Sequence, residues 1–430
     1  MAGKNQLNRK TDTITEVAYK VTPVRWPLLF VGFLYKYPYQ RLNLLIMIEI
    51  KKFSLLINLD LSELKTFNIN QKLQLNKTVT MKKIFSFLVS GIMLIPFQEA
   101  FSQTASVDNA KLDSAIKVAD RIIETDPRIF FKNVESIIVF SDGKLKFEKY
   151  YNGYNGDSLH HIQSQTKSIV ALLMGIAIDK GFVENENVQV ASYYPEYFSN
   201  GDKLKSRVTI RDLLTMTAGF AWEEMIPFEN PENDNAKMYR SGNWLRYSLS
   251  RPMATEPFRE FKYNSGCPMI VAGIIEKATK MRLDEFADKY LFGPLSINNY
   301  SWLEDPAGFF HAGGGLRMLP ADVVKIGILV LNNGKWASRQ VVSEGWIRKM
   351  LRPYISTSMD SSEYGYFWWI RDMPLRENQN IIMASAEGAG GQKLYVFPDY
   401  RLVIAFTERN YTTPQVSPLF IKESVLPALD

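Results

Sequence analysis

The sequence offers very little thiol or imidazole chemistry. Cys267 is its one cysteine, so an intramolecular disulfide is excluded, and a lone cysteine is more often a small buried hydrophobe than a nucleophile. The three histidines, His160, His161 and His311, show no metal-ligand spacing. We therefore expect neither a metal centre nor an organic cofactor.

Basic charge is also scarce beyond the first hundred residues. The formal net charge of the 430-residue chain is +6. Residues 1–102 carry this excess, because residues 103–430 hold slightly more Asp and Glu than Lys and Arg. With no basic patch evident in this larger part, nucleic acid is not an expected partner.

Long apolar runs are missing from residues 1–80, where charged side chains interrupt each run before it reaches membrane-spanning length. A secretory signal, which belongs at an N-terminus, follows this segment rather than preceding it. We therefore expect translation to start at Met81 and residues 1–80 to be an over-extended gene start. A genuine N-terminal extension is the alternative.

Residues 81–102 have the features of a signal peptide. The stretch MKKIFSFLVSGIMLIPF has a charged start and a short apolar core, and small residues precede a cleavage site after Ser102. A short buried or membrane helix is the alternative interpretation. No lipoprotein cysteine follows the apolar core, so we expect the mature protein, residues 103–430, to be periplasmic or secreted in a bacterium, without stable insertion in the membrane.

Strand signals lie at both ends of the mature chain and helical signals between them. Residues 136–151 read as a β-hairpin around an Asp-Gly turn, and the stretches YGYFWWI, KLYVFP and RLVIAFTER read as strands. From about 183 to 290 the pattern is mostly helical. We therefore predict one α/β (α+β) domain over 103–430, with a sheet built from both termini, flanking helices and a mostly helical insertion.

A Ser-x-x-Lys pattern occurs four times, and its context separates one copy from the others. Only Ser164 opens a long apolar helix, ending near Gly181, with Lys167 on the same helix face within reach of the serine hydroxyl. Burial favours the neutral amine of a lysine, which can accept a proton, and the helix N-terminus favours a developing oxyanion. The alternative is that Ser164 caps the helix while Lys167 extends to water. The pair alone does not decide between these readings.

The wider sequence resembles the serine β-lactamase and penicillin-binding-protein family, in particular its class C-like esterase and 6-aminohexanoate-oligomer hydrolase branch. The resemblance covers roughly residues 135–410, and its blocks occur in the order of the family. They are FEKYYNGYNGDSLHHIQSQTKSIVALLMGIAIDKG, VTIRDLLTMTAGFAW, FKYNSGCPMIVAGIIEKATK, GGGLRMLPADVVKIGILVLNNGKW and GAGGQKLYVFPDYRLVIAFTE. The resemblance implies a β-lactamase/transpeptidase-like fold with an antiparallel sheet.

The resemblance also implies catalytic roles, residue by residue. Ser164 matches the acylated nucleophile, Lys167 its base, and Tyr263 the second-motif tyrosine that passes a proton to the leaving group. The third motif matches the glycine-rich run GAGGQ, and we expect Gly391 to complete, with the N–H of Ser164, the oxyanion hole. Gln392 is the neighbouring candidate and a substrate contact. A core tyrosine and a plain hairpin turn are the alternative interpretations of these last two motifs.

Departures from the family pattern bear on the substrate. Ser265 stands where β-lactamases usually have asparagine, and we expect it to contact substrate. No Lys-Thr-Gly occurs at the third motif, so the cation that holds a β-lactam carboxylate is missing. Phe258, Lys280 and Ser296 stand where the family often has glycine. The G-x-S-x-G elbow of the α/β-hydrolases is absent.

These observations predict an exported serine hydrolase that cleaves a small-molecule ester or amide through a Ser164 acyl-enzyme. Two alternatives stay open: a class C-like β-lactamase or D-amino-acid peptidase acting on cell-wall peptides, and a non-catalytic ligand-binding or sensor protein. The same machinery serves esters, amides and lactams, so the sequence alone does not choose the bond.

Overall fold

The computed structural model describes residues 106–199, 201–357, 359–376 and 379–429. The predicted signal peptide and the doubtful extension before it lie outside the described residues. Within the described ranges, no helix is both long enough and apolar enough to cross a membrane.

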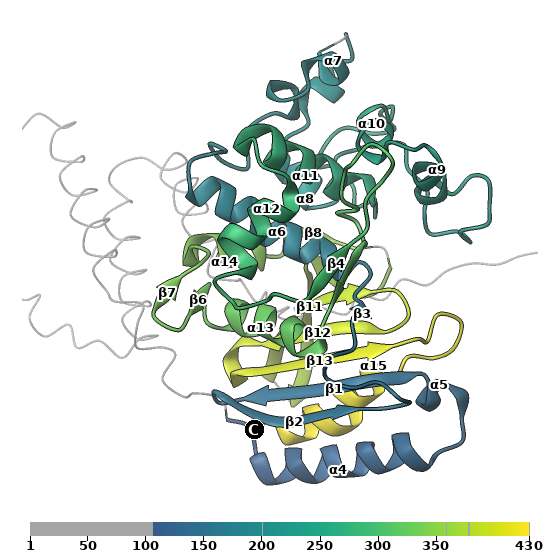
Figure 1. Cartoon of the computed structure of the whole chain (residues 1–430), viewed down its shortest axis with the longest axis vertical. Helices are drawn as coiled ribbons and strands as arrows, with labels where there is room; N and C mark the ends of the chain where they lie inside the picture. The colour runs from purple at the N-terminus through teal and green to yellow at the C-terminus, as the bar shows by residue number, and fades with distance from the viewer. Residues whose placement is uncertain (1–105, 200, 358, 377–378, 430) are drawn as a thin grey trace, which may run out of the picture. The chain divides into compact units, whose positions relative to one another are not determined.

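An antiparallel sheet forms the centre of the described region (Figure 1). Its strand order is β2-β1-β13-β12-β11-β10-β9-β8, so strands from the two ends of the chain lie side by side. The sheet predicted from both termini is therefore confirmed. The strands are β1 (Val134–Ser141), β2 (Lys144–Tyr150), β8 (Ile355–Ser356), β9 (Glu363–Tyr364), β10 (Trp369–Arg376), β11 (Gln379–Gly388), β12 (Gln392–Phe397) and β13 (Leu402–Glu408).

Strand alternation divides the core between the two faces of this sheet. On one face, residues such as Leu394 and Val403 pack with the buried helices α6 (Gln165–Asp179) and α13 (Pro320–Leu331). On the other face, Tyr395 and Phe406 pack with α4 (Asn109–Thr125) and α15 (Val416–Phe420). Figure 1 shows the sheet between these two helical layers.

The described elements from Val190 to Phe292 are helical, and most lie in the upper part of Figure 1, away from the large sheet. The main helices of this region are α7 (Pro195–Phe198), α8 (Ile210–Leu214), α9 (Asp234–Arg240), α10 (Trp244–Leu249), α11 (Gly266–Thr279) and α12 (Leu283–Ala287). One small sheet contains β3 (His160–His161), β4 (Tyr300–Trp302) and β5 (Leu316–Met318), and a second contains β6 (Lys335–Trp336) and β7 (Arg339–Gln340). The short helix α5 (Ile129–Lys132) precedes β1, and α14 (Glu344–Met350) precedes β8.

Helix α6 connects the helical region to the sheet. It is apolar all round, as expected of a helix buried on every side, and it packs against α11 as well as against β11 and β12. The helix ends at Asp179, and Gly181 follows with φ +74°, the left-handed conformation that favours glycine after a helix. Its N-terminal end therefore lies where the helical region meets the sheet.

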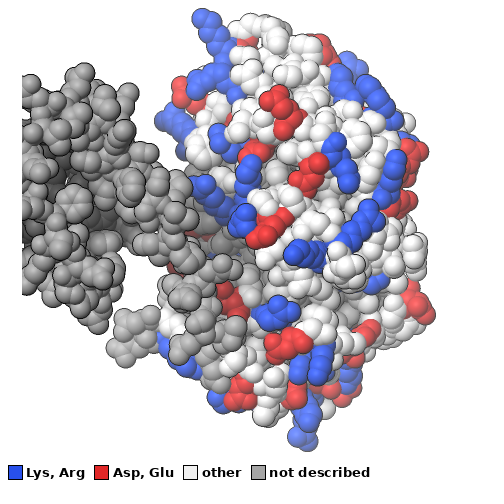
Figure 2. All heavy atoms as spheres, turned by 90° about the vertical axis from the view of Figure 1, so that its left-hand side faces the viewer, with Lys and Arg blue, Asp and Glu red and all other residues white. Residues whose placement is uncertain are grey.

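Charged side chains on the face drawn in Figure 2 are of both signs. Lys and Arg alternate with Asp and Glu over the coloured part of this face. Ion pairs in the described region include the exposed pair of Arg348 and Glu344. Such exposed pairs contribute little stability, about 0–1 kcal/mol each.

Candidate active site

Ser164 sits directly before the first turn of α6, in the turn that follows β3. It takes the N-cap position of the helix, but its side chain caps no backbone N–H. Gln163, the preceding residue, has φ +52°, a conformation that costs a non-glycine residue about 1–3 kcal/mol. The hydroxyl of Ser164 is therefore not used as a helix cap, and the backbone before it is strained.

Lys167 does not extend to water. Its side chain is buried, with 1% of its surface exposed. Its Nζ donates to Ser164 Oγ at 2.8 Å and to the main-chain oxygen of Gly313 at 2.5 Å. The structure thus excludes the reading in which this lysine is a solvated surface residue, and it places the amine in direct contact with the serine hydroxyl.

Tyr263 completes a cluster with this pair. The ammonium of Lys167 lies 4.9 Å from the centre of the Tyr263 ring. The Tyr263 ring also stacks against the ring of Trp369, with centroids 6.0 Å apart and planes at 23°. Trp368, the residue before Trp369, is fully buried, and Trp369 is 8% exposed.

Ser265 lies beside these residues but points to a partner that the sequence pattern does not reveal. Its N–H and its Oγ both donate to the carboxylate of Glu224, at 2.8 Å and 2.9 Å. Trp222 Nε1 donates to the same carboxylate at 2.6 Å. Glu224 is therefore a further residue of the candidate site, and no motif spacing signals it because it lies 41 residues before Ser265.

The glycine-rich run contacts the nucleophile turn through Gly388, at the end of β11. A Cβ placed on Gly388 would lie 2.5 Å from the main-chain oxygen of Ile162 and 2.8 Å from Cβ of Gln163. Gly391, the expected oxyanion-hole residue, lies elsewhere: a Cβ there would meet the side chain of Glu408 at 2.7 Å. Gly388, the last residue of β11, thus makes the close approach to the nucleophile turn, and the oxyanion-hole role expected of Gly391 stays a prediction.

The side chain of Gln392 is not available to a ligand in this conformation. It is 2% exposed and donates to the main-chain oxygen of Glu408, inside the sheet. The reason is strand alternation, since Gln392 is the first residue of β12 and pairs with Gly388. The structure therefore does not support the substrate contact that we expected from the side chain of Gln392.

The backbone N–H groups at issue are that of Ser164, which precedes α6, and those of the turn between β11 and β12. A pair of unpaired N–H groups beside a nucleophile is the arrangement that stabilises a tetrahedral oxyanion. The assignment of the second donor to Gly391 stays a prediction, and Ala389 in the same turn is a further candidate.

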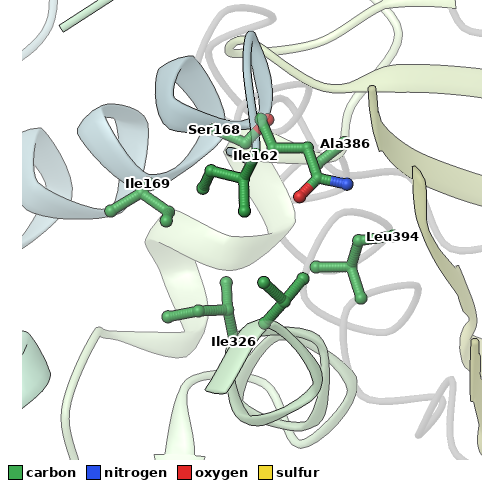
Figure 3. Close-up of a pocket in the computed structure, with 8 residues that line it drawn as sticks. Ile162, Ser168, Ile169, Ile326, Ala386 and Leu394 are labelled. Carbon is green, nitrogen blue, oxygen red and sulfur yellow. The ribbon is translucent and has the colours of Figure 1, made fainter. Parts of the chain in front are cut away.

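A small apolar cavity lies under the nucleophile turn (Figure 3). Ile162, Ile169, Ile326 and Leu394 line it, so α6, α13 and β12 meet there. The hydroxyl of Ser168, also shown in Figure 3, donates to the main-chain oxygen of Phe367 at 2.6 Å. Its apolar lining and enclosed position make this cavity part of the core rather than a substrate site.

No group of three or more His, Cys, Asp or Glu side chains in the described ranges has the geometry of a metal site. Cys267 is buried, and burial raises the pKa of its thiol well above the usual value. A thiol in this state is a poor nucleophile. Within the described region, the serine, the lysine and the tyrosine therefore remain the candidate reacting groups.

Comparison with known proteins places this geometry in a family. The β-lactamase family model matches residues 134–420. The 6-aminohexanoate-dimer hydrolase of Paenarthrobacter ureafaciens is 23% identical over 301 residues, which cover 65% of this chain and 74% of that protein.

Two solved structures share the fold. The octameric penicillin-binding protein homologue from Pyrococcus abyssi has a TM-score of 0.54 at 20% identity, covering 74% of this chain and 77% of that one. The hydrolase EstCE1 has a TM-score of 0.60 at 13% identity, covering 74% of this chain and 99% of that one. The predicted β-lactamase/transpeptidase-like fold is confirmed, and the chain belongs to the β-lactamase family of serine hydrolases.

Proposed function

We propose that the protein is an exported hydrolase that cleaves an ester or amide bond through an acyl-enzyme on Ser164. The observation that carries this proposal is the contact of the buried Lys167 Nζ with Ser164 Oγ, beside the ring of Tyr263. Burial of an amine costs free energy unless the amine forms hydrogen bonds. Here one of its hydrogen-bond partners is the hydroxyl that the amine would activate.

The reaction follows from the positions of these groups. Lys167, as the neutral amine and acting with Tyr263, takes the proton of Ser164, whose Oγ attacks the carbonyl carbon. The oxyanion accepts hydrogen bonds from the N–H of Ser164 and from an N–H of the glycine-rich turn, that of Gly391 or Ala389. Tyr263 protonates the leaving alcohol or amine, and water then attacks the acyl-enzyme to release the acid and restore the serine.

An ester or amide is favoured over a β-lactam as the substrate. The third motif has no Lys-Thr-Gly sequence. The carboxylate of a β-lactam substrate would therefore lack the lysine that usually binds it. The relative from Paenarthrobacter ureafaciens is named for the hydrolysis of an amide, the 6-aminohexanoate dimer. A β-lactamase or D-amino-acid peptidase is the alternative, and turnover of a chromogenic cephalosporin against that of a short acyl ester separates the two.

The intact mass of the protein after exposure to a fluorophosphonate tests the proposal. We expect one adduct in the parent and none in Ser164→Ala, because the probe reacts only with an activated serine. Absence of an adduct from well-folded parent protein would instead favour a ligand-binding or sensor protein that keeps the fold.

Export is a separate part of the proposal. It rests on the signal-like residues 81–102, so we expect the mature protein to begin at Gln103 and to reach the periplasm or the medium. N-terminal sequencing of the protein from its native host decides this point. A mature chain that retains residues 1–80 would contradict it.

A further inference from the structure

Glu224 carries a negative charge that the described protein does not neutralise. Its carboxylate accepts three hydrogen bonds, from Ser265 N, Ser265 Oγ and Trp222 Nε1. All three donors are uncharged. A carboxylate offers about four acceptor positions, so one position on Oε1 is unused.

The neighbouring acidic residues differ in this respect. Glu223 pairs with Lys262 at 2.9 Å, and Asp234 pairs with Arg251 at 3.3 Å. Within the described ranges, Glu224 forms no ion pair, although it is only half-buried. A partly desolvated carboxylate without a cation attracts a positive group more strongly than an exposed one does.

This charge lies close to the reacting groups. Ser265, which holds Glu224, is two residues after Tyr263 and touches Gly313: a Cβ on Gly313 would lie 3.0 Å from the main-chain oxygen of Ser265. The main-chain oxygen of the same glycine accepts the hydrogen bond from Lys167. Glu224 is therefore connected to Lys167 through two intervening residues, Ser265 and Gly313.

Aromatic residues lie near the carboxylate. Trp222 donates to it through Nε1 and packs edge to face with Tyr247, with centroids 6.0 Å apart. Burial, with the charge of Glu224 as a further cause, raises the pKa of Tyr239 to about 12. Aromatic side chains near a carboxylate add apolar contact area for the alkyl part of an alkylammonium group.

Two cations of the described sheet, Arg371 and Lys393, are already paired with carboxylates. Arg371 pairs with Glu387 and with Asp360, and Lys393 pairs with the same Glu387. Their charges are therefore matched within the protein.

Resting on the proposed function, we propose that Glu224 makes this site selective for substrates that carry an ammonium group beside the scissile ester or amide bond. Glu224 recognises charge, while Ser164, Lys167 and Tyr263 perform the chemistry. An ammonium in either the acyl part or the leaving group meets this description.

Two pairs of nearly isosteric esters test the proposal on the full chain. The first pair is the β-alanyl ester of 4-nitrophenol, which is cationic, and its butanoyl ester, which is neutral. The second pair is the butanoate ester of choline, which is cationic, and that of 3,3-dimethylbutanol, which is neutral. We expect the cationic member of at least one pair to have a kcat/KM about tenfold higher, and this preference to fall with added salt. Glu224→Gln removes the charge but keeps an oxygen acceptor for Ser265, and it should bring the ratio close to one.

Glu223→Gln is the matched control, because the charge of Glu223 is already paired with Lys262; it should leave the ratio unchanged. A merely structural role for Glu224 would lower turnover of both members equally and leave the ratio intact. That result, or a ratio of about one in the parent for both pairs, would overturn the proposal. Failure of the proposed function looks different: no fluorophosphonate adduct and no turnover of any ester, which refutes both proposals together.

Discussion

Lys167→Met is the substitution that most directly tests whether the buried lysine is a base. Methionine has a similar length and no charge, so the variant loses the hydrogen bond to Ser164 Oγ and that to Gly313 while largely filling the space. A positioned general base contributes about 10²–10⁴-fold to a rate. We therefore expect acylation of Ser164 to slow by that factor, equivalent to about 3–5 kcal/mol of activation free energy.

The effect on folding should be much smaller. Burial of an ammonium costs several kcal/mol, and hydrogen bonds to a charged group return about 1.5–3 kcal/mol each. These contributions oppose each other, so the free energy of unfolding of Lys167→Met should lie within about 2 kcal/mol of that of the parent. Lys167→Ala would be less stable than Lys167→Met, because it also leaves a cavity.

The assay is the time course of fluorophosphonate labelling, followed by intact mass, together with thermal unfolding of the same samples. Lys205→Met is the control, since Lys205 is also buried but donates to the main-chain oxygens of Leu249 and Arg251. We expect this control to label at the parent rate. If Lys167→Met unfolds cooperatively and labels as fast as the parent, the lysine is not a base.

Three further predictions follow from the geometry. Gly388→Ala should slow labelling at least about 100-fold, because its Cβ would lie 2.5 Å from the main-chain oxygen of Ile162, whereas Gly345→Ala, with nothing within 4 Å, should match the parent in the same assay. Lys280→Gly should raise the free energy of unfolding by about 1 kcal/mol in a denaturant titration, since Lys280 has φ +59°. Burial lowers the pKa of His311 to about 3. The unfolded chain then binds the extra proton between about pH 3 and 6.5, so stability should rise with pH across this window, and His311→Phe should flatten the rise.

The sequence contains enough information for the sheet and for the serine–lysine pair, because both depend on local patterns. Alternation and an Asp-Gly turn marked residues 136–151 as a hairpin, and the structure has strands at 134–141 and 144–150. The spacing of Ser164 and Lys167 needs only a helix to bring their side chains together, and α6 provides it.

Long-range details were beyond the pattern. Three glycines occur within four residues of the third motif, and only the end of β11 decides that Gly388 meets the nucleophile turn. Gln392 reads as a polar residue near the site, yet the hairpin turns its side chain into the sheet. Glu224 contacts Ser265 through a loop, and no periodicity connects the two positions.

The replacement of the usual second-motif asparagine by Ser265 gains a physical meaning from Glu224. A serine is too short to supply the amide it replaces, but its N–H and hydroxyl together hold a carboxylate in the same neighbourhood. Because that carboxylate touches Ser265 and not Lys167, its charge should govern which substrates bind more than how fast the serine is acylated. Lys167 variants should show the converse, a slower acylation with the same substrate ratio, so the two sets of variants separate selectivity from chemistry.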